Sequence, residues 1–181
     1  MTNHCTKRPP EALFLCFFLY SVIGWLYEVF LEVVVYQRGF SNRGFLFGPY
    51  LPVYGFGALL FLLLLWNLKE KGVHLGRVNV TPLVLFLACG LIATAVELVT
   101  SFGLDLLHLK LWDYSHYACN FQGRIALNPS VRFGLGGLLF LYILQPLFDR
   151  LLSALPAAVR RGLVVGLGCL LSMDLLYTLL H

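Results

Sequence analysis

Five stretches of the chain are apolar and long enough to cross a lipid bilayer as α-helices. They cover about residues 12–36, 49–68, 82–107, 129–152 and 162–180. A helix needs about 20 apolar residues to cross the hydrocarbon core of a bilayer. The sequence therefore predicts an all-α polytopic membrane protein with about five transmembrane helices. We expect residues 1–181 to form a single integral membrane domain.

The composition agrees with a membrane protein and excludes several other classes. Only 12% of the residues are charged and the mean hydropathy is +0.81, whereas soluble domains carry about 25% charged residues. The net charge of +4 comes from residues between apolar segments rather than from a basic stripe, so we expect no nucleic-acid partner. The five cysteines form no CxxC pair, and no P-loop motif occurs. We therefore expect no metal site and no cofactor.

Basic residues are unevenly divided between the two ends of the predicted helices. The N-terminus and the second and fourth connecting segments hold Lys7, Arg8, Lys69, Lys71, Arg77, Arg150, Arg160 and Arg161. The first and third connecting segments hold Arg38, Arg43, Lys110 and Arg124. Because cytoplasmic segments carry the excess of Lys and Arg, the N-terminus is predicted to be cytoplasmic and the C-terminus outside. The first segment, 12–36, is interpreted as a retained signal-anchor helix.

The chain also contains an internal similarity between its first and second halves. Each half has a glutamate within a helix, an arginine in the following loop, a proline before the next helix and paired glycines inside it. The matched positions are Glu28 with Glu97, Glu32 with Ser101, Arg43 with Arg124, Gly48-Pro49 with Asn128-Pro129, and 55–61 with 134–140. We interpret this as a duplicated helix–loop–helix unit, about 12–68 and 82–152, followed by an extra helix over 162–180. Copies of equal orientation should be related by an axis along the membrane normal.

The repeated charged residues predict a polar site near the outer leaflet. Glu28 and Glu97 lie within apolar segments, where an unpaired charge costs several kcal/mol, so each needs a partner. Arg43 and Arg124 precede the prolines that we expect to begin the next helices, and a helix N-terminus attracts anions. One interpretation is a site for an anionic solute or a lipid head group. The alternative is a structural pair of salt bridges, Glu28 with Arg43 and Glu97 with Arg124.

Other polar residues in the two outer loops extend this predicted site. The third loop contains the run from Trp112 to Asn120, and the first loop contributes Asn42. The complete set of candidate ligand-binding residues is Glu28, Arg43, Glu97, Arg124, Asn42, Trp112, Asp113, Tyr114, Asn120 and Asn128. Catalytic residues are not identified. The spacing of Asp113, His116 and Cys119 matches no zinc pattern. Glu32 and Asp174 are expected at the membrane interface.

These segments resemble a family of bacterial membrane proteins, the putative ABC-transporter type IV proteins. The resemblance rests on GWLYE (24–28), NRGFLFGP (42–49), PVYG (52–55), ELVTS (97–101), WDYS (112–115) and NFQGRI (120–125). Gln122 stands where the family pattern leads us to expect an asparagine, which puts a role for that amide in doubt. The resemblance implies a multi-span protein of the bacterial inner membrane, and the family name implies a permease.

Three functions remain open from the sequence. The first is a transporter-like or permease-like protein with the polar Glu/Arg site described above. The second is a membrane-embedded enzyme that acts on a lipid or lipid-linked substrate, and the third is a non-catalytic membrane subunit. The expected partners are membrane lipids, together with either a second copy of the chain or a partner membrane subunit, because five helices barely enclose a path through the bilayer.

Overall fold

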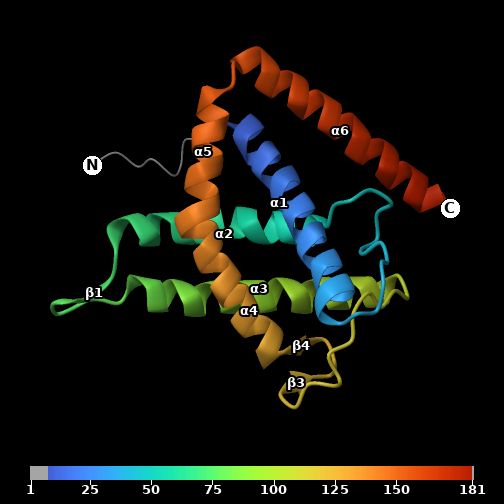
Figure 1. The fold of residues 1–181 in the computed structure, drawn as a ribbon, viewed down its shortest axis with the longest axis horizontal. Helices are drawn as coiled ribbons and strands as arrows, with labels where there is room; N and C mark the ends of the chain where they lie inside the picture. The colour runs from blue at the N-terminus through green and yellow to red at the C-terminus, as the bar shows by residue number, and fades with distance from the viewer. Residues whose placement is uncertain (1–7, 181) are drawn as a thin grey trace. The chain divides into compact units, whose positions relative to one another are not determined.

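The structure, a computed structural model, describes residues 8–180, so Cys5 and Lys7 lie outside the described part of the chain. Within it, five helical segments are long and apolar enough to cross a membrane, which confirms the predicted all-α polytopic fold (Figure 1). They comprise α1 (Pro10–Phe30) with the π-helical η2 (Leu31–Val35), α2 (Pro52–Lys71), α3 (Thr81–Leu106), α4 (Leu127–Leu139) with η3 (Phe140–Leu144) and α5 (Gln145–Ala154), and α6 (Ala157–Leu180).

Three helix starts differ from the prediction. Helix α2 begins at Pro52 and not at Pro49, because residues 48–51 form a tight turn in which the Tyr50 N–H bonds to the Gly48 carbonyl at 2.9 Å. Helix α4 begins at Leu127, so Pro129 lies in its first turn, where a missing N–H costs no hydrogen bond. Helix α6 begins directly after Pro156, five residues before the predicted start at 162.

Two short antiparallel hairpins connect the helices. Strands β1 (His74–Leu75) and β2 (Val78–Asn79) join α2 to α3, and β3 (Asn120–Phe121) and β4 (Ile125–Ala126) lead into α4 (Figure 1). The second hairpin turns through Gln122 and Gly123, which both have positive φ angles, of 54° and 67°. Because these hairpins precede and follow α3, they lie at its opposite ends.

Packing divides the described chain into two compact units. One consists of residues 60–149 and is called the α3–α4 unit below; the other joins residues 8–59 to 150–180 and is called the α1–α6 unit. Packing, and not sequence similarity, defines these units, so the duplication predicted for 12–68 and 82–152 stays a prediction.

In the α1–α6 unit, small residues allow α1 and α2 to approach closely. A Cβ atom added at Gly55 would collide with the Ser21 hydroxyl and the Phe17 carbonyl. One at Gly24 would collide with the Tyr54 ring. The Ser21 hydroxyl donates to the Phe17 carbonyl at 2.8 Å, so this polar group is satisfied within its own helix. Such contacts between small residues are the usual basis of helix packing in membranes.

The α3–α4 unit uses the same kind of contact. Helix α3 packs along α4, where a Cβ atom at Gly134 would lie 2.8 Å from the Phe86 carbonyl. The Thr94 and Ser130 hydroxyls, one on each helix, lie 2.6 Å apart. Each hydroxyl also lies within hydrogen-bond distance of the carbonyl four residues earlier, so one of the two donates to that carbonyl and accepts from the other hydroxyl. This hydrogen bond fixes the register of two otherwise apolar helices.

Candidate functional site

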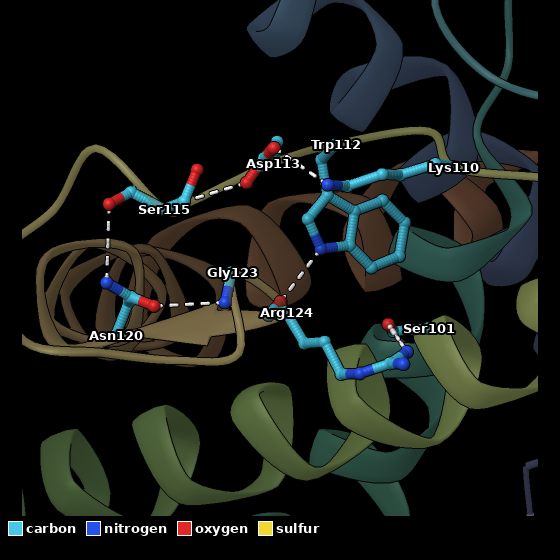
Figure 2. Close-up of polar contacts among 8 residues, drawn as sticks. All are labelled: Ser101, Lys110, Trp112, Asp113, Ser115, Asn120, Gly123 and Arg124. Carbon is cyan, nitrogen blue, oxygen red and sulfur yellow. Dashed lines mark hydrogen bonds and ion pairs between the residues drawn. The ribbon is translucent and has the colours of Figure 1, made fainter.

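The central residue of the site in the α3–α4 unit is Arg124, which follows the turn of the β3–β4 hairpin. Its Nη1 donates to the Ser101 Oγ at 2.8 Å (Figure 2). Its Nη2 pairs with the Asp105 carboxylate. Ser101 and Asp105 are one helical turn apart near the end of α3. The guanidinium carbon also lies 4.5 Å from the centre of the Phe102 ring, a cation–π contact. The hairpin thus places a cation over the last turns of α3.

The loop before the hairpin is hydrogen-bonded to it. Trp112 donates its indole N–H to the Arg124 carbonyl at 2.8 Å, and the Asn120 side chain accepts from the Gly123 N–H at 2.9 Å (Figure 2). Residue 123 must be glycine, because its φ is positive and a Cβ atom would lie 2.7 Å from Asp113 Oδ1. Trp112 and Asn120 therefore hold the backbone that carries Arg124.

Asp113 keeps its negative charge through local hydrogen bonds. It accepts from the Lys110 ammonium at 2.7 Å and from the Ser115 backbone N–H at 2.9 Å. The Lys110 contact, followed by those of Ser115, holds the pKa of Asp113 well below its usual range. Both groups are exposed, so the pair orders the loop and adds little to overall stability.

Glu97 lies deeper than the other acidic groups of the unit. Its side chain is buried on α3, and it accepts a hydrogen bond from the Tyr114 hydroxyl at 2.8 Å. The Tyr114 backbone N–H in turn donates to the Gly123 carbonyl at 2.8 Å. Tyr114 therefore connects the helix carboxylate to the hairpin.

A cavity of about 160 Å³ lies at the end of α3 between the helix, the loop and the hairpin. It is lined by Ser101, Leu104, Asp105, Leu109, Lys110, Leu111, Trp112, Gln122, Gly123 and Arg124. The lining combines two cations, one carboxylate and an indole with several leucines. This is the chemistry expected of a site at the boundary between apolar membrane and water.

In the α1–α6 unit, the predicted pairing of Arg43 with Glu28 is wrong. Arg43 forms its salt bridge with Glu32, which also lies 3.8 Å from Arg38. Glu28 instead accepts a hydrogen bond from the Tyr54 hydroxyl. The reason is distance along the chain: Glu32 lies one turn nearer the loop than Glu28, within η2. Glu32 is therefore buried in an ion pair, not extended toward water at the interface.

The predicted pairing of Arg124 with Glu97 is wrong in the same way, since Arg124 reaches Asp105 two turns further along α3. Asp105 was missed in the sequence, although a signal existed. Glu97, Ser101 and Asp105 are spaced by four residues and so lie on one helix face.

Asp174, predicted at the membrane interface, is hydrogen-bonded to the first loop, and its depth in the membrane stays a prediction. Its carboxylate accepts from the backbone N–H groups of Phe47 at 3.0 Å and Gly48 at 2.8 Å, and from the Tyr50 hydroxyl. Burial, followed by the hydrogen bond to Asp174, raises the pKa of the Tyr50 phenol. The carboxylate beside Gly48-Pro49 is therefore held by donors of a loop and not by the predicted helix N-terminus, and it belongs to the chain itself.

The remaining predicted residues are placed as follows. Asn42 accepts from the Trp25 indole N–H at 2.7 Å and donates to the Phe47 carbonyl at 2.8 Å, which shapes the first loop. Asn128 is exposed in the first turn of α4. Seven predicted site residues, Glu97, Trp112, Asp113, Tyr114, Asn120, Arg124 and Asn128, belong to the α3–α4 unit. Glu28, Asn42 and Arg43 belong to the α1–α6 unit, and a shared site with the first group stays a prediction.

Among residues 8–180, no group of three or more His, Cys, Asp or Glu side chains is arranged to hold a metal ion. The His116 ring instead packs on the Tyr117 ring, with 4.2 Å between the ring centres.

Comparison with known proteins identifies one family. A family model described as putative ABC-transporter type IV matches residues 15–179, which is most of the chain. No curated protein and no solved structure matches the chain.

Proposed function

The chain belongs to the putative ABC-transporter type IV family, and from that membership we propose a transporter-like protein of the bacterial inner membrane that binds an anionic group at Arg124. The anionic group is the phosphate or carboxylate of a solute or of a lipid head group. The observation that carries the proposal is the 160 Å³ cavity beside the anchored guanidinium of Arg124.

The hydrogen-bond count supports a ligand at this guanidinium. An arginine side chain has five N–H donors. Three of the Arg124 N–H donors bond to Gln122, Ser101 and Asp105, which leaves two N–H donors for the oxygen atoms of a ligand. Because these contacts already hold the guanidinium in place, little side-chain conformational entropy is lost when a ligand binds to it. The paired geometry of a guanidinium suits phosphate and carboxylate oxygens.

The duplicated architecture is part of the same proposal. In the first copy Gly55 packs against Phe17, and in the second the equivalent Gly134 packs against the equivalent Phe86. Arg43 bonds to Glu32 in the first copy, and in the second Arg124 bonds to Ser101, which matches Glu32 in the predicted register. The matched residues Phe61 and Phe140 touch, with ring centres 5.9 Å apart. Equivalent residues of two copies meet at a symmetry axis, so this contact supports two related helix–loop–helix units.

The orientation of the protein is proposed from its basic residues: a cytoplasmic N-terminus, with residues 107–126 outside. Cys119 in this loop is exposed, and Arg77 lies in the hairpin at the opposite end of α3. A variant with Cys119 as its sole cysteine should react with an impermeant maleimide in intact cells. A variant with Arg77→Cys as its sole cysteine should react only after the cells are opened. The reverse pattern contradicts the orientation.

Binding can be tested with the purified protein in nanodiscs. We expect bound phosphatidylglycerol, or inorganic phosphate added to phosphatidylcholine discs, to be detected by native mass spectrometry and calorimetry; the two arms separate a lipid source from a free anion. Arg124→Gln should weaken binding about 10-fold to 100-fold, since a hydrogen bond to a charged group contributes about 1.5–3 kcal/mol. Arg77→Gln, an exposed arginine outside the cavity, is the matched control. Equal affinity in both variants contradicts the proposal.

A further inference from the structure

Three hydrogen-bond donors of the α1–α6 unit converge on one point. The backbone N–H groups of Phe47 and Gly48 are successive in the chain, and the Tyr50 hydroxyl points to the same place. Successive backbone N–H groups in a turn form a concave site that binds anions. All three donate to the carboxylate of Asp174, so the site already holds an anionic oxygen pair in this structure.

The donors are fixed by contacts that do not involve Asp174. The Tyr50 side chain is only 2% exposed, and its backbone N–H bonds to the Gly48 carbonyl. The next residue, Leu51, donates its N–H to the Ser21 carbonyl of α1 at 2.9 Å. Residue 48 must be glycine, since a Cβ atom would collide with the Tyr50 ring. The site should therefore persist when Asp174 is absent.

The helix that carries Asp174, α6, lies at the surface of its own unit. No described residue of α6 is buried within the structure. At its N-terminal end Arg161 lies 3.3 Å from Glu11, and in its middle a Cβ atom on Gly168 would be 3.9 Å from the Phe14 ring. Helix α6 also packs on α1, and the Tyr177 ring lies 6.0 Å from the Phe47 ring, but because no described residue of α6 is buried, replacing its carboxylate with another anion disrupts no buried side chain of α6.

A cavity of about 240 Å³ adjoins these donors. It is lined by Asn42, Phe45, Leu46, Phe47, Tyr177 and Thr178. Its lining comes from both the loop and α6, so an anion can reach the donors along the surface that separates them.

We infer that Phe47, Gly48 and Tyr50 form a second anion-binding site, which Asp174 fills and which the carboxylate or phosphate of an external ligand can take in its place. The site lies in a different unit from Arg124 and does not depend on it. Entry of a ligand releases Asp174, and with it the C-terminal half of α6. The site thereby couples anion binding to movement of a membrane helix.

The test is chemical rescue of Asp174→Ala in detergent. Hydrogen exchange at the Phe47 and Gly48 amides should speed up in this variant, and its melting temperature should fall by several degrees. Millimolar acetate or inorganic phosphate should restore both, whereas chloride at equal ionic strength should not. Adding Tyr50→Phe should weaken the rescue, because one of the three donors is lost. Rescue in nanodiscs of phosphatidylglycerol but not of phosphatidylcholine would identify an anionic lipid head group as a ligand of the site.

The inference is overturned if no carboxylate or phosphate restores amide protection, or if rescue is unchanged by Tyr50→Phe. If Asp174→Ala does not fold, a second experiment on the chain that keeps Asp174 tests the inference. A spin label on Cys169, which is exposed on α6, should become more mobile when phosphate is added. An unchanged label then counts against displacement of Asp174.

Discussion

At the scale of single residues, the acidic partners of the two arginines in the repeated motif differ greatly in solvent exposure. The Glu32 side chain that pairs with Arg43 is 9% exposed, whereas the Asp105 side chain that pairs with Arg124 is 48% exposed. A charge left alone costs much more in a buried place than in water. Arg43 is therefore expected to stabilise the fold, and Arg124 to remain available for a ligand.

We predict that Arg43→Gln lowers the free energy of unfolding by about 3 kcal/mol, because it leaves the Glu32 carboxylate buried with only the more distant Arg38. Arg38→Gln, the matched control at a 66% exposed side chain, should cost at most about 1 kcal/mol. Unfolding in detergent with chemical denaturant measures both. Adding Glu32→Gln to Arg43→Gln should recover most of the loss. If the two arginine variants are equally stable, the buried ion pair has no such role.

The residues that sequence reasoning identified and missed follow a simple rule. Glu97, Arg124 and Trp112 were found because charged and aromatic residues are conspicuous in an apolar chain. Their partners were harder to predict, since Arg124 was paired with Glu97 and Asp105 was not considered. Which carboxylate an arginine meets depends on loop conformation, here on the left-handed Gln122 and Gly123, and that conformation has no clear sequence signal.

At the scale of helices, close packing depends on which glycine faces a neighbour. Gly55 and Gly57 are two residues apart on α2, yet only Gly55 faces α1; a Cβ atom at Gly57 would meet nothing within 4 Å. Gly134 and Gly136 repeat this difference on α4. The chain thus offers two matched pairs of positions in the same predicted register.

We predict that Gly55→Ala and Gly134→Ala each destabilise the protein by about 1–3 kcal/mol, because the new methyl group must displace backbone or a buried ring. Gly57→Ala and Gly136→Ala should leave the free energy of unfolding unchanged or raise it by up to about 1 kcal/mol, because alanine favours the helix. Thermal unfolding of the four variants in one detergent compares them directly. A loss at Gly57 equal to that at Gly55 would show that helix propensity, not packing, explains the glycines.

Five apolar stretches were sufficient to predict the helices, because bilayer thickness sets their length. The starts were less certain, since a proline can take any position in the first turn of a helix and α2 has two candidates. Pro49 and Pro52 both suit a helix start, and the hydrogen bond from Leu51 to Ser21 decides for Pro52. The π-helical turns were missed entirely; η2 widens the end of α1 where Glu32 is buried. Such wide turns are often found at functional sites.

At the scale of the whole molecule, the open question is whether the two repeated motifs share one site. The sequence predicts that Glu28, Arg43, Glu97 and Arg124 converge near the outer leaflet. Each motif is already satisfied locally, by Glu32 in one unit and by Ser101 and Asp105 in the other. Convergence is therefore not needed to neutralise the charges. It would instead bring two guanidinium groups to one ligand, which suits a doubly charged phosphate better than a carboxylate.

We predict that Ser41→Cys and Gln122→Cys become cross-linked within one chain, in a background without native cysteines. Each site is two residues from its arginine, which adds at most about 7 Å of chain. A bifunctional maleimide of about 15 Å should therefore connect them if the arginines share a pocket. Ser41→Cys with Arg77→Cys is the control, because the hairpin that holds Arg77 lies at the other end of α3. Monomer mass on a denaturing gel identifies a link within one chain. Cross-linking no faster than in the control would mean that the two motifs do not share a site, and phosphate binding should then depend on Arg124 and be unaffected by Arg43→Gln.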